Sequence, residues 1–373
     1  MLAQKYSRVS LLSLLGVMIT SCISPETQHA PNLLLRRDVP GENHRVKVMQ
    51  VFFDGTANKW STRTNVRRRF EAAALAEDPS HPCLYIDGVG NNSVTGAVLG
   101  HGLKPRVIEG YKFISDNYRT GSEKIRIFGF SRGAFQARVL TGLMAHCGVP
   151  QIHGQDPDPE KTLAKVMEEI WDYNRESLLD INSTDSGKWE AHLAANQNLI
   201  RDHITRRYPS VKFTYPSIQF MGLWDTVPGL QFARIKNHTT MDSSSGQRYK
   251  VRPYPNVEII AHALALDESR KQFMPLLVGG PINQSKSTVY EVWFPGAHSD
   301  IGGGYRDSND MAGVSFNWID SIMLHHGIVP RPTKAYPDAS FVQHHPENSI
   351  LKITGVEPRR LPDNAIIDAT VFT

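Results

Sequence analysis

Short apolar runs alternate along the chain with stretches whose apolar residues recur at helical spacing. Five runs rich in β-branched and aromatic residues predict β-strands, at residues 46–53, 83–86, 125–130, 218–224 and 289–294. The fourth run is almost continuously apolar, which is typical of strands buried on both faces of a parallel sheet. The pattern therefore predicts a buried, mostly parallel sheet at the centre of the protein.

Four amphipathic stretches predict helices, at residues 105–118, 133–146, 159–179 and 189–204. Residues 259–266 are apolar without a decisive period, so they fit either a short helix or a strand. Strands that alternate with helices indicate an α/β fold, with helices on both faces of the central sheet.

The last two of these helices interrupt the alternation. They lie within residues 151–212, between two predicted strands, so we expect an inserted helical cap. Two roles are open for it. Either it gates an apolar pocket, or it is a packing excursion without a role in the chemistry.

The N-terminus has the features of a secretory signal. Lys5 and Arg8 precede an apolar stretch at residues 11–19 that is too short to span a bilayer. The segment ends in Ile-Thr-Ser-Cys at Cys22, which resembles the lipobox of bacterial lipoproteins. We therefore expect residues 1–21 to be a lipoprotein signal peptide; an ordinary signal peptide with a chance cysteine and a buried helix are the alternatives.

Lipidation of Cys22 would anchor the protein, because several acyl chains hold a protein on a membrane far better than one. By resemblance, Ile23 in place of an aspartate favours the outer membrane, so we expect the protein in the bacterial envelope, facing the periplasm. Residues 22–44 contain several prolines and little periodicity, and we interpret them as a tether. The folded domain is expected over residues 45–345, with a C-terminal extension at 346–373.

Composition narrows the function classes. Hydrophobic residues make up 40% and charged residues 21% of the 373 residues, which supports a large folded core. The net charge is only +4, and no basic stripe interleaved with aromatic residues is present, so nucleic acid is not an expected partner. Cys83 and Cys147 either pair in an oxidising compartment or remain separate buried thiols.

The residues at 129–133 carry the strongest chemical signal. Gly129-Phe130-Ser131-Arg132-Gly133 matches G-x-S-x-G, between a predicted strand and a predicted helix. In an α/β-hydrolase-like fold such a serine is the nucleophile, held in a strained turn that flanking glycines permit. The helix dipole also favours negative charge there. The alternative is a helix N-cap serine.

A base and an acid are expected after later strands. Asp225 follows the strand at 218–224, and His298 follows the strand at 289–294, so both would lie at the edge of the sheet that holds Ser131. His262 and His238 are weaker candidates for the base. Asp300 is the alternative acid, although it lies only two residues from His298.

An oxyanion hole needs two backbone N–H groups. The N–H of Arg132 is one candidate, and the turn at Gly55 and Thr56 is the other. A divalent metal held by His298, Asp300 and Asp54 is a competing possibility, but no H-E-x-x-H spacing supports it. We expect no metal and no cofactor.

Five motifs in this order resemble the α/β-hydrolase domain of the phospholipase effectors of type VI secretion and their uncharacterised relatives. They are FFDGT (52–56), GFSRGAF (129–135), LWDTV (223–227), HALALDE (262–268) and PGAHSDIGGGY (295–305). The resemblance covers about residues 46–330. It implies hydrolysis of carboxylic esters, typically phospholipid acyl esters, with Ser131, Asp225 and His298 as the triad. Asp267 and Arg270 also match, and we expect a structural ion pair between them.

A lipoprotein signal is not expected on a secreted effector, so we expect a resident envelope enzyme. The sequence then predicts a serine hydrolase that cleaves phospholipid or other lipid acyl esters. Two alternatives remain: an esterase or deacylase for non-lipid envelope esters, and a non-catalytic binding protein that retains the hydrolase fold.

Overall fold

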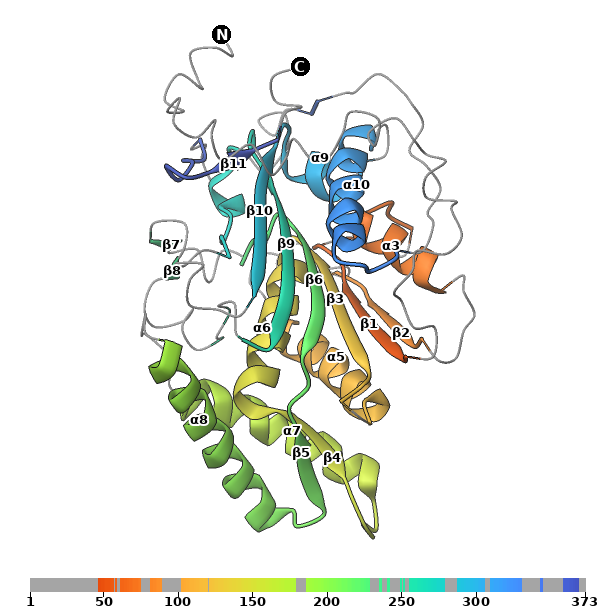
Figure 1. Ribbon diagram of the computed structural model, residues 1–373, viewed down its shortest axis with the longest axis vertical. Helices are drawn as coiled ribbons and strands as arrows, with labels where there is room; N and C mark the ends of the chain where they lie inside the picture. The colour runs from red at the N-terminus through yellow and green to blue at the C-terminus, as the bar shows by residue number, and fades with distance from the viewer. Residues whose placement is uncertain are drawn as a thin grey trace.

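A seven-stranded β-sheet in which every strand is parallel to its neighbours forms the centre of the molecule (Figure 1). The computed structural model describes residues 46–56, 58, 61–74, 81–88, 102–119, 121–178, 186–228, 235–236, 240–241, 249, 251, 255–278, 287–305, 309–330, 343–344 and 358–368. The strands are β1 (Val48–Phe53), β2 (Cys83–Ile86), β3 (Lys124–Phe130), β6 (Ile218–Trp224), β9 (Val257–Ala265), β10 (Thr288–Phe294) and β11 (Ile366–Ile367).

Helices cover both faces of this sheet, as predicted. Alternate residues of a strand point to opposite faces, so neighbours such as Val51 and Phe52 enter different cores. On the face of Val51 lie α5 (Leu103–Asn117) and α6 (Arg132–Cys147), whereas α3 (Asn65–Ala74) and α10 (Asp310–His325) cover the face of Phe52. On that second face the rings of Phe52 and Phe128 stack with centroids 5.1 Å apart. The fold is therefore an α/β-hydrolase-like, three-layer arrangement.

The strand order reverses direction between β1 and β3. The order is β11-β10-β9-β6-β3-β1-β2, so the chain moves from β1 to one side for β2 and then crosses to the other side for β3. In open parallel sheets, ligands bind outside the carboxyl ends of the strands at such a reversal. The chain leaves β3 at this point and enters the turn that carries Ser131.

The helical insertion lies at the opposite end of the sheet (Figure 1). It contains β4 (Val149–Ile152), α7 (Pro159–Glu176), α8 (Ser186–Arg207) and β5 (Val211–Thr214), and its two strands pair as an antiparallel hairpin. Helix α6 runs antiparallel to the strands, so it ends near their amino ends. The insertion follows α6 and precedes β6, which starts at the same end of the sheet. Side chains of α8 accordingly bond to His146 and Ala145 in the last turn of α6.

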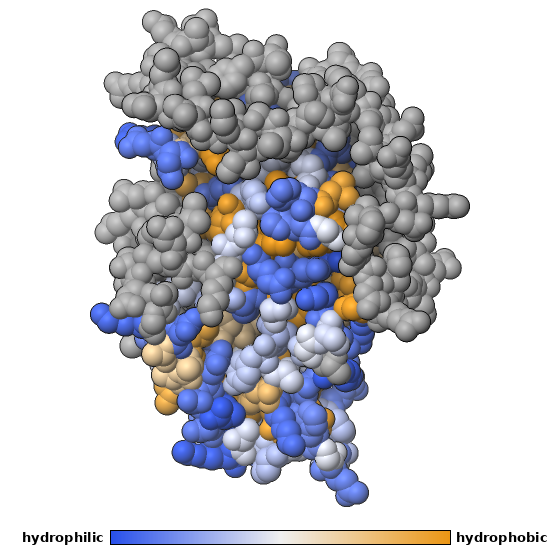
Figure 2. Space-filling view, viewed as in Figure 1, coloured by the Kyte–Doolittle hydropathy of each residue, from blue (hydrophilic) through white to orange (hydrophobic). Residues whose placement is uncertain are grey.

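This position bears on the two roles considered for the insertion. The insertion is present as expected, but its hairpin and α8 lie away from the carboxyl ends of the strands, so the structure favours packing over gating. Figure 2 shows that the side of the insertion facing the viewer is mainly hydrophilic. Among its described residues, Leu199 is the large apolar side chain that is exposed.

Residues 259–266, which fitted a helix or a strand, form most of β9 between β6 and β10. The remaining short elements are the β7–β8 hairpin (Ile235–Lys236 and Thr240–Met241), a 3₁₀ turn (Lys271–Phe273) and α9 (His298–Gly302).

The C-terminal residues take part in the central sheet. The extension predicted at 346–373 contributes β11, which pairs with Val292 and Trp293 of β10. A boundary at residue 345 therefore does not separate this extension from the hydrolase domain, because backbone pairing joins the two.

Cys83 and Cys147 are both free thiols, so the expected alternative of separate thiols holds and the disulfide does not. None of the helices in the described ranges combines the length and the apolar character needed to cross a bilayer. The predicted signal peptide at 1–21, the lipidation site Cys22 and the tether at 22–44 lie outside the described residues.

Candidate active site

Ser131 occupies a sharp turn between β3 and α6. Its φ of 58° and ψ of −125° are unusual for a residue with a side chain and place it in a strained conformation. The flanking glycines make the turn possible. A Cβ atom at Gly129 would lie 2.6 Å from the Cα of Ala134, and one at Gly133 would lie 2.2 Å from the backbone oxygen of Phe53. The turn therefore has the geometry of a nucleophile elbow.

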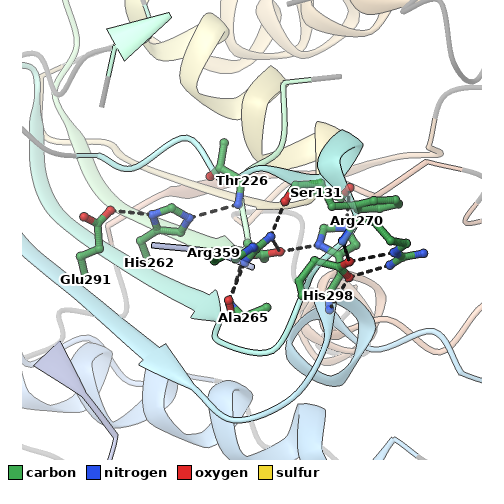
Figure 3. A network of polar contacts seen from close by, with 11 residues as sticks. Ser131, Thr226, His262, Ala265, Arg270, Glu291, His298 and Arg359 are labelled. Atoms are coloured by element: carbon green, nitrogen blue, oxygen red, sulfur yellow. Dashed lines mark hydrogen bonds and ion pairs between the residues drawn. The ribbon is translucent and has the colours of Figure 1, made fainter. Parts of the chain in front are cut away.

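Ser131, His298 and Asp225 form one continuous chain of hydrogen bonds. Ser131 and His298 are labelled in Figure 3. The Oγ of Ser131 lies 2.7 Å from Nε2 of His298, and Nδ1 of His298 lies 2.5 Å from Oδ2 of Asp225. The three residues are 4%, 4% and 0% exposed. They follow β3, β10 and β6, so three segments that are distant in sequence meet at one edge of the sheet.

The loop that carries Asp225 is tied directly to the elbow. The N–H of Ser131 donates to the backbone oxygen of Trp224, and the N–H of Val227 donates to the backbone oxygen of Ser131. Asp225 also has a positive φ of 41°. Strained backbone of this kind persists where the surrounding structure enforces it, often at functional sites.

Asp300, the alternative acid, has other partners. Its Oδ2 accepts a hydrogen bond from the N–H of Ala297, and its Oδ1 lies 2.6 Å from Nδ1 of His344. Asp300 thus caps the first turn of α9, the short helix that begins with His298. The carboxylate that contacts the imidazole ring of His298 is that of Asp225.

His262, the rival base, has a structural environment. Its ring is fully buried, accepts a hydrogen bond from the N–H of Thr226 at Nε2, and contacts Glu291 through Nδ1 at 2.8 Å. Since Thr226 follows Asp225 directly, the contacts of His262 with Thr226 and Glu291 support the loop that carries Asp225; Figure 3 shows them to the left of Ser131 and His298. His238, the other rival, lies outside the described residues.

Burial and aromatic neighbours control the protonation of His298. Phe130 and Phe273 lie against its ring, with centroids at 4.7 and 4.8 Å. Burial lowers the pKa of His298 below its ordinary value of 6.5, and the hydrogen bond to Asp225 only partly offsets this effect. A lowered pKa favours the neutral imidazole, which is the state a general base needs.

An ion pair next to His298 differs from the one expected. Arg270 pairs with Glu268 at 2.7 Å, not with Asp267. Glu268 also accepts the N–H of His298, while Asp267 accepts the N–H of Gly296. The expected pair of Asp267 and Arg270 is therefore wrong, and the acidic partner is the next residue along the chain.

The oxyanion candidates fare differently. The N–H of Gly55 donates to Oδ1 of Asp54 at 2.6 Å, so it is already used, and this part of the expectation is wrong. Arg132 is the first residue of α6 and directly follows Ser131. Its backbone N–H therefore has no hydrogen-bond partner within the helix. Arg132 and Thr56 remain the candidates.

Asp54, Asp300 and His298 are not brought together as metal ligands. Asp54 accepts hydrogen bonds from the hydroxyls of Thr64 and Tyr85, whereas the other two have the separate partners given above. Burial raises the pKa of Asp54 to about 6, and these hydrogen bonds oppose the rise. Within the described part of the chain, no group of three or more histidine, cysteine or acidic side chains is placed to hold a metal ion.

Arg359 is a site residue that the sequence did not indicate. Its Nη1 and Nη2 lie 2.6 and 2.8 Å from Oδ1 and Oδ2 of Asp225. Burial acts to raise the pKa of Asp225, but the charge of Arg359 and the hydrogen bonds from Arg359 and His298 hold it below its ordinary value. Arg359 lies 134 residues from Asp225 in a segment without periodic pattern, so only the fold reveals the contact.

Comparisons with known proteins identify the family. The model of the T6SS phospholipase effector Tle1-like catalytic domain matches residues 47–321. The curated "Uncharacterized protein YEL023C" of Saccharomyces cerevisiae is 22% identical over 245 residues, which are 60% of this chain and 31% of that protein. This chain thus matches about a third of the length of that relative.

Similar solved structures include a dienelactone hydrolase from Anabaena variabilis, at 11% identity and a TM-score of 0.32, covering 76% of this chain and 88% of that one. The RedJ thioesterase of the Streptomyces coelicolor prodiginine pathway has 12% identity and a TM-score of 0.31, covering 75% and 96%.

Proposed function

Since this chain belongs to the family of T6SS phospholipase effector Tle1-like catalytic domains, we propose that it is a serine hydrolase that cleaves phospholipid acyl esters through Ser131, His298 and Asp225. The observation that carries the proposal is the hydrogen-bonded chain from the Oγ of Ser131 through His298 to Asp225. A helix N-cap serine would not need a buried imidazole 2.7 Å from its hydroxyl.

The residues perform acyl transfer in two stages. Nε2 of His298 takes the proton of Ser131 while Oγ attacks the ester carbonyl carbon. The N–H of Arg132 donates to the oxygen that becomes negative, at the positive end of the α6 dipole. The protonated imidazole then gives its proton to the leaving alcohol. Water attacks the acyl-enzyme with His298 as base, which releases the fatty acid and restores Ser131.

Asp225 has a supporting role in both stages. Its Oδ2 accepts the Nδ1–H of His298, which leaves Nε2 free to accept the serine proton. Its negative charge stabilises the imidazolium that forms during each proton transfer. The family supports a lipid ester as the substrate; an ester of another envelope component is the alternative that the experiment below separates.

A lipid-class hydrolysis screen with wild type and Ser131→Ala tests the proposal. Loss of a triad residue costs several orders of magnitude in kcat, so Ser131→Ala should release no fatty acid above background. The matched control is Ser217→Ala, at an exposed serine on the amino side of β6, which should behave as wild type. Chromatographic quantification of released fatty acids is the measurement.

Two outcomes would overturn parts of the proposal. Cleavage of short acyl esters without any long-chain preference would indicate a non-lipid esterase. Failure of the wild type to react with a fluorophosphonate probe, under conditions that label a known serine hydrolase, would favour the non-catalytic binding protein.

We also propose that a lipid on Cys22 anchors the mature protein in the bacterial envelope, at the outer membrane and facing the periplasm. The support is the lipobox-like sequence that ends at Cys22. Cells fed labelled palmitate should incorporate label into wild type but not into Cys22→Ser. Label retained in the variant would remove the basis for the anchor.

A further inference from the structure

A segment near the C-terminus enters the active site from outside the region that the family model matches. The match ends at residue 321, and Arg359 lies beyond it. The guanidinium of Arg359 is buried and spans both oxygens of Asp225, in a bidentate arrangement. It also donates to the backbone oxygens of Ala265 and Phe273, which fix its plane (Figure 3).

The same region of the chain contacts the loops after three neighbouring strands. Gln343 donates to Asp267 after β9, and His344 contacts Asp300 after β10. Arg359 contacts Asp225 after β6, and β11 extends the sheet beyond β10. The contacts to Asp267, Asp300 and Asp225 all fall in loops at the carboxyl ends of the strands, near His298. The segment therefore affects the geometry of the site as well as the edge of the sheet.

We propose that Arg359 is a positioning residue of the triad: it holds both oxygens of Asp225, keeps the carboxylate ionised, and directs Oδ2 towards Nδ1 of His298. This inference rests on the proposed function, because it assigns Arg359 a part in the same acyl transfer. Arg359 touches neither the substrate nor Ser131 in this role. It acts through Asp225.

The need for such a residue follows from burial. Asp225 is fully buried, and an ionised carboxylate without compensation is costly in such a place. His298 cannot compensate alone, because it must be neutral before each proton transfer. A permanently charged guanidinium provides the balance in every step, since arginine does not lose its proton in proteins.

The charges around the pair set the expected direction of a pH effect. Three charged groups lie around the His298–Asp225 pair: Arg359 from the C-terminal segment acts on Asp225, and Glu268 and Arg270 from the loop after β9 act on His298. Glu268 and Arg270 pair with one another, so Arg359 is the cation that compensates Asp225. Without it, the Asp225–His298 pair binds a proton more readily and does so at higher pH.

The decisive comparison is Arg359→Met against Arg360→Met, its exposed neighbour and matched control. In Arg359→Met, kcat/KM should fall about 100-fold, as expected when a reacting group loses its alignment. The acidic limb of the pH profile of kcat/KM should move up by about 1 to 3 pH units. Arg360→Met should leave both unchanged. An unmoved acidic limb in a folded Arg359→Met would overturn the proposal.

An NMR titration of His298 separates this proposal from the proposed function. The pKa of His298 should be higher in Arg359→Met than in wild type, whether or not any ester is cleaved. An equal pKa in the two proteins would refute the role of Arg359 even if Ser131→Ala abolishes hydrolysis. A higher pKa without any hydrolysis by wild type would instead leave the electrostatic role intact and refute the hydrolase.

If Arg359→Met does not fold, Arg359→Lys decides. Lysine keeps the charge but loses the planar two-point contact. Its acidic limb should stay near that of wild type while kcat/KM still falls about 10-fold or more. Wild-type kcat/KM in Arg359→Lys would show that orientation by the guanidinium is not needed, and would overturn the proposal.

Discussion

The buried carboxyl of Asp54 makes the stability of this protein depend on pH in a direction that can be worked out. Asp54 directly follows β1, is 1% exposed, and accepts hydrogen bonds from Gly55, Thr64 and Tyr85. Burial raises its pKa from 3.8 to about 6. The folded protein therefore holds this proton more tightly than the unfolded chain does.

The free energy follows from that difference. The contribution of Asp54 to stability is fully present below the unfolded pKa of 3.8 and is lost as the pH rises through about 6. A difference of about 2 pKa units corresponds to about 3 kcal/mol. Asp54→Asn keeps the shape of the side chain and removes its titration. The unfolding free energy of the variant, relative to wild type, should rise by about 2 to 3 kcal/mol between about pH 4 and about pH 7.

Urea unfolding followed by tryptophan fluorescence at several pH values measures this difference. Asp363→Asn, at an exposed aspartate, provides the matched control. A difference between Asp54→Asn and wild type that stays constant across this pH range would refute the reasoning. It would mean that the carboxyl is solvated or that its hydrogen bonds offset its burial completely.

Three further predictions follow from the site and the core. Since burial lowers the pKa of His298, kcat/KM for ester hydrolysis should fall only below about pH 6.5. A pH profile in which kcat/KM is half-maximal clearly above that pH would contradict the burial argument. Gly133→Ala should reduce both kcat/KM and the melting temperature, because its Cβ would lie 2.2 Å from the backbone oxygen of Phe53; wild-type values of both would show that the elbow is looser than described. Arg69→Met should cost about 3 to 5 kcal/mol in urea unfolding because it removes the guanidinium that bonds to the buried carboxyl of Asp320, and the double variant with Asp320→Leu should recover most of that loss. Equal losses in the single and double variants would argue against a buried pair.

Much of the central sheet could be predicted from local pattern. The strands at 83–86 and 218–224 have the predicted bounds, and those at 46–53, 125–130 and 289–294 differ by two residues or fewer at either end. Buried parallel strands are apolar along their whole length, and this signal is local. For residues 259–266 the local signal was insufficient, because pairing with β6 and β10 decides the strand.

Elements with weak local signals were missed. In α3 a run of three arginines hides an apolar stripe that includes Val66 and Phe70, and α10 lies beyond the last predicted strand. β11 has only two residues, and its partners are more than 70 residues away in the sequence. Neither composition nor periodicity can indicate such a pairing.

The candidate site was predictable wherever a residue follows a strand directly. Ser131, Asp225 and His298 were identified in this way, and the fold brings their side chains into contact, although their catalytic roles remain a proposal. Gly55 was misassigned because a sequence does not show that a neighbouring carboxylate already binds its N–H. Arg359 was missed because no strand or motif precedes it.

The strand order also bears on how the protein assembles during synthesis. Every described strand of the central sheet after β1 pairs with a strand made earlier: β2 and β3 with β1, then β6, β9, β10 and β11 each with its predecessor in the row. The sheet can therefore grow outward from β1 as the ribosome delivers the chain, and no paired strand waits for a partner not yet made. From β6 onward, each new strand pairs with the strand made before it, which until then forms an unpaired edge of the sheet. That edge is therefore exposed only briefly and has less time to pair with a strand of another protein chain.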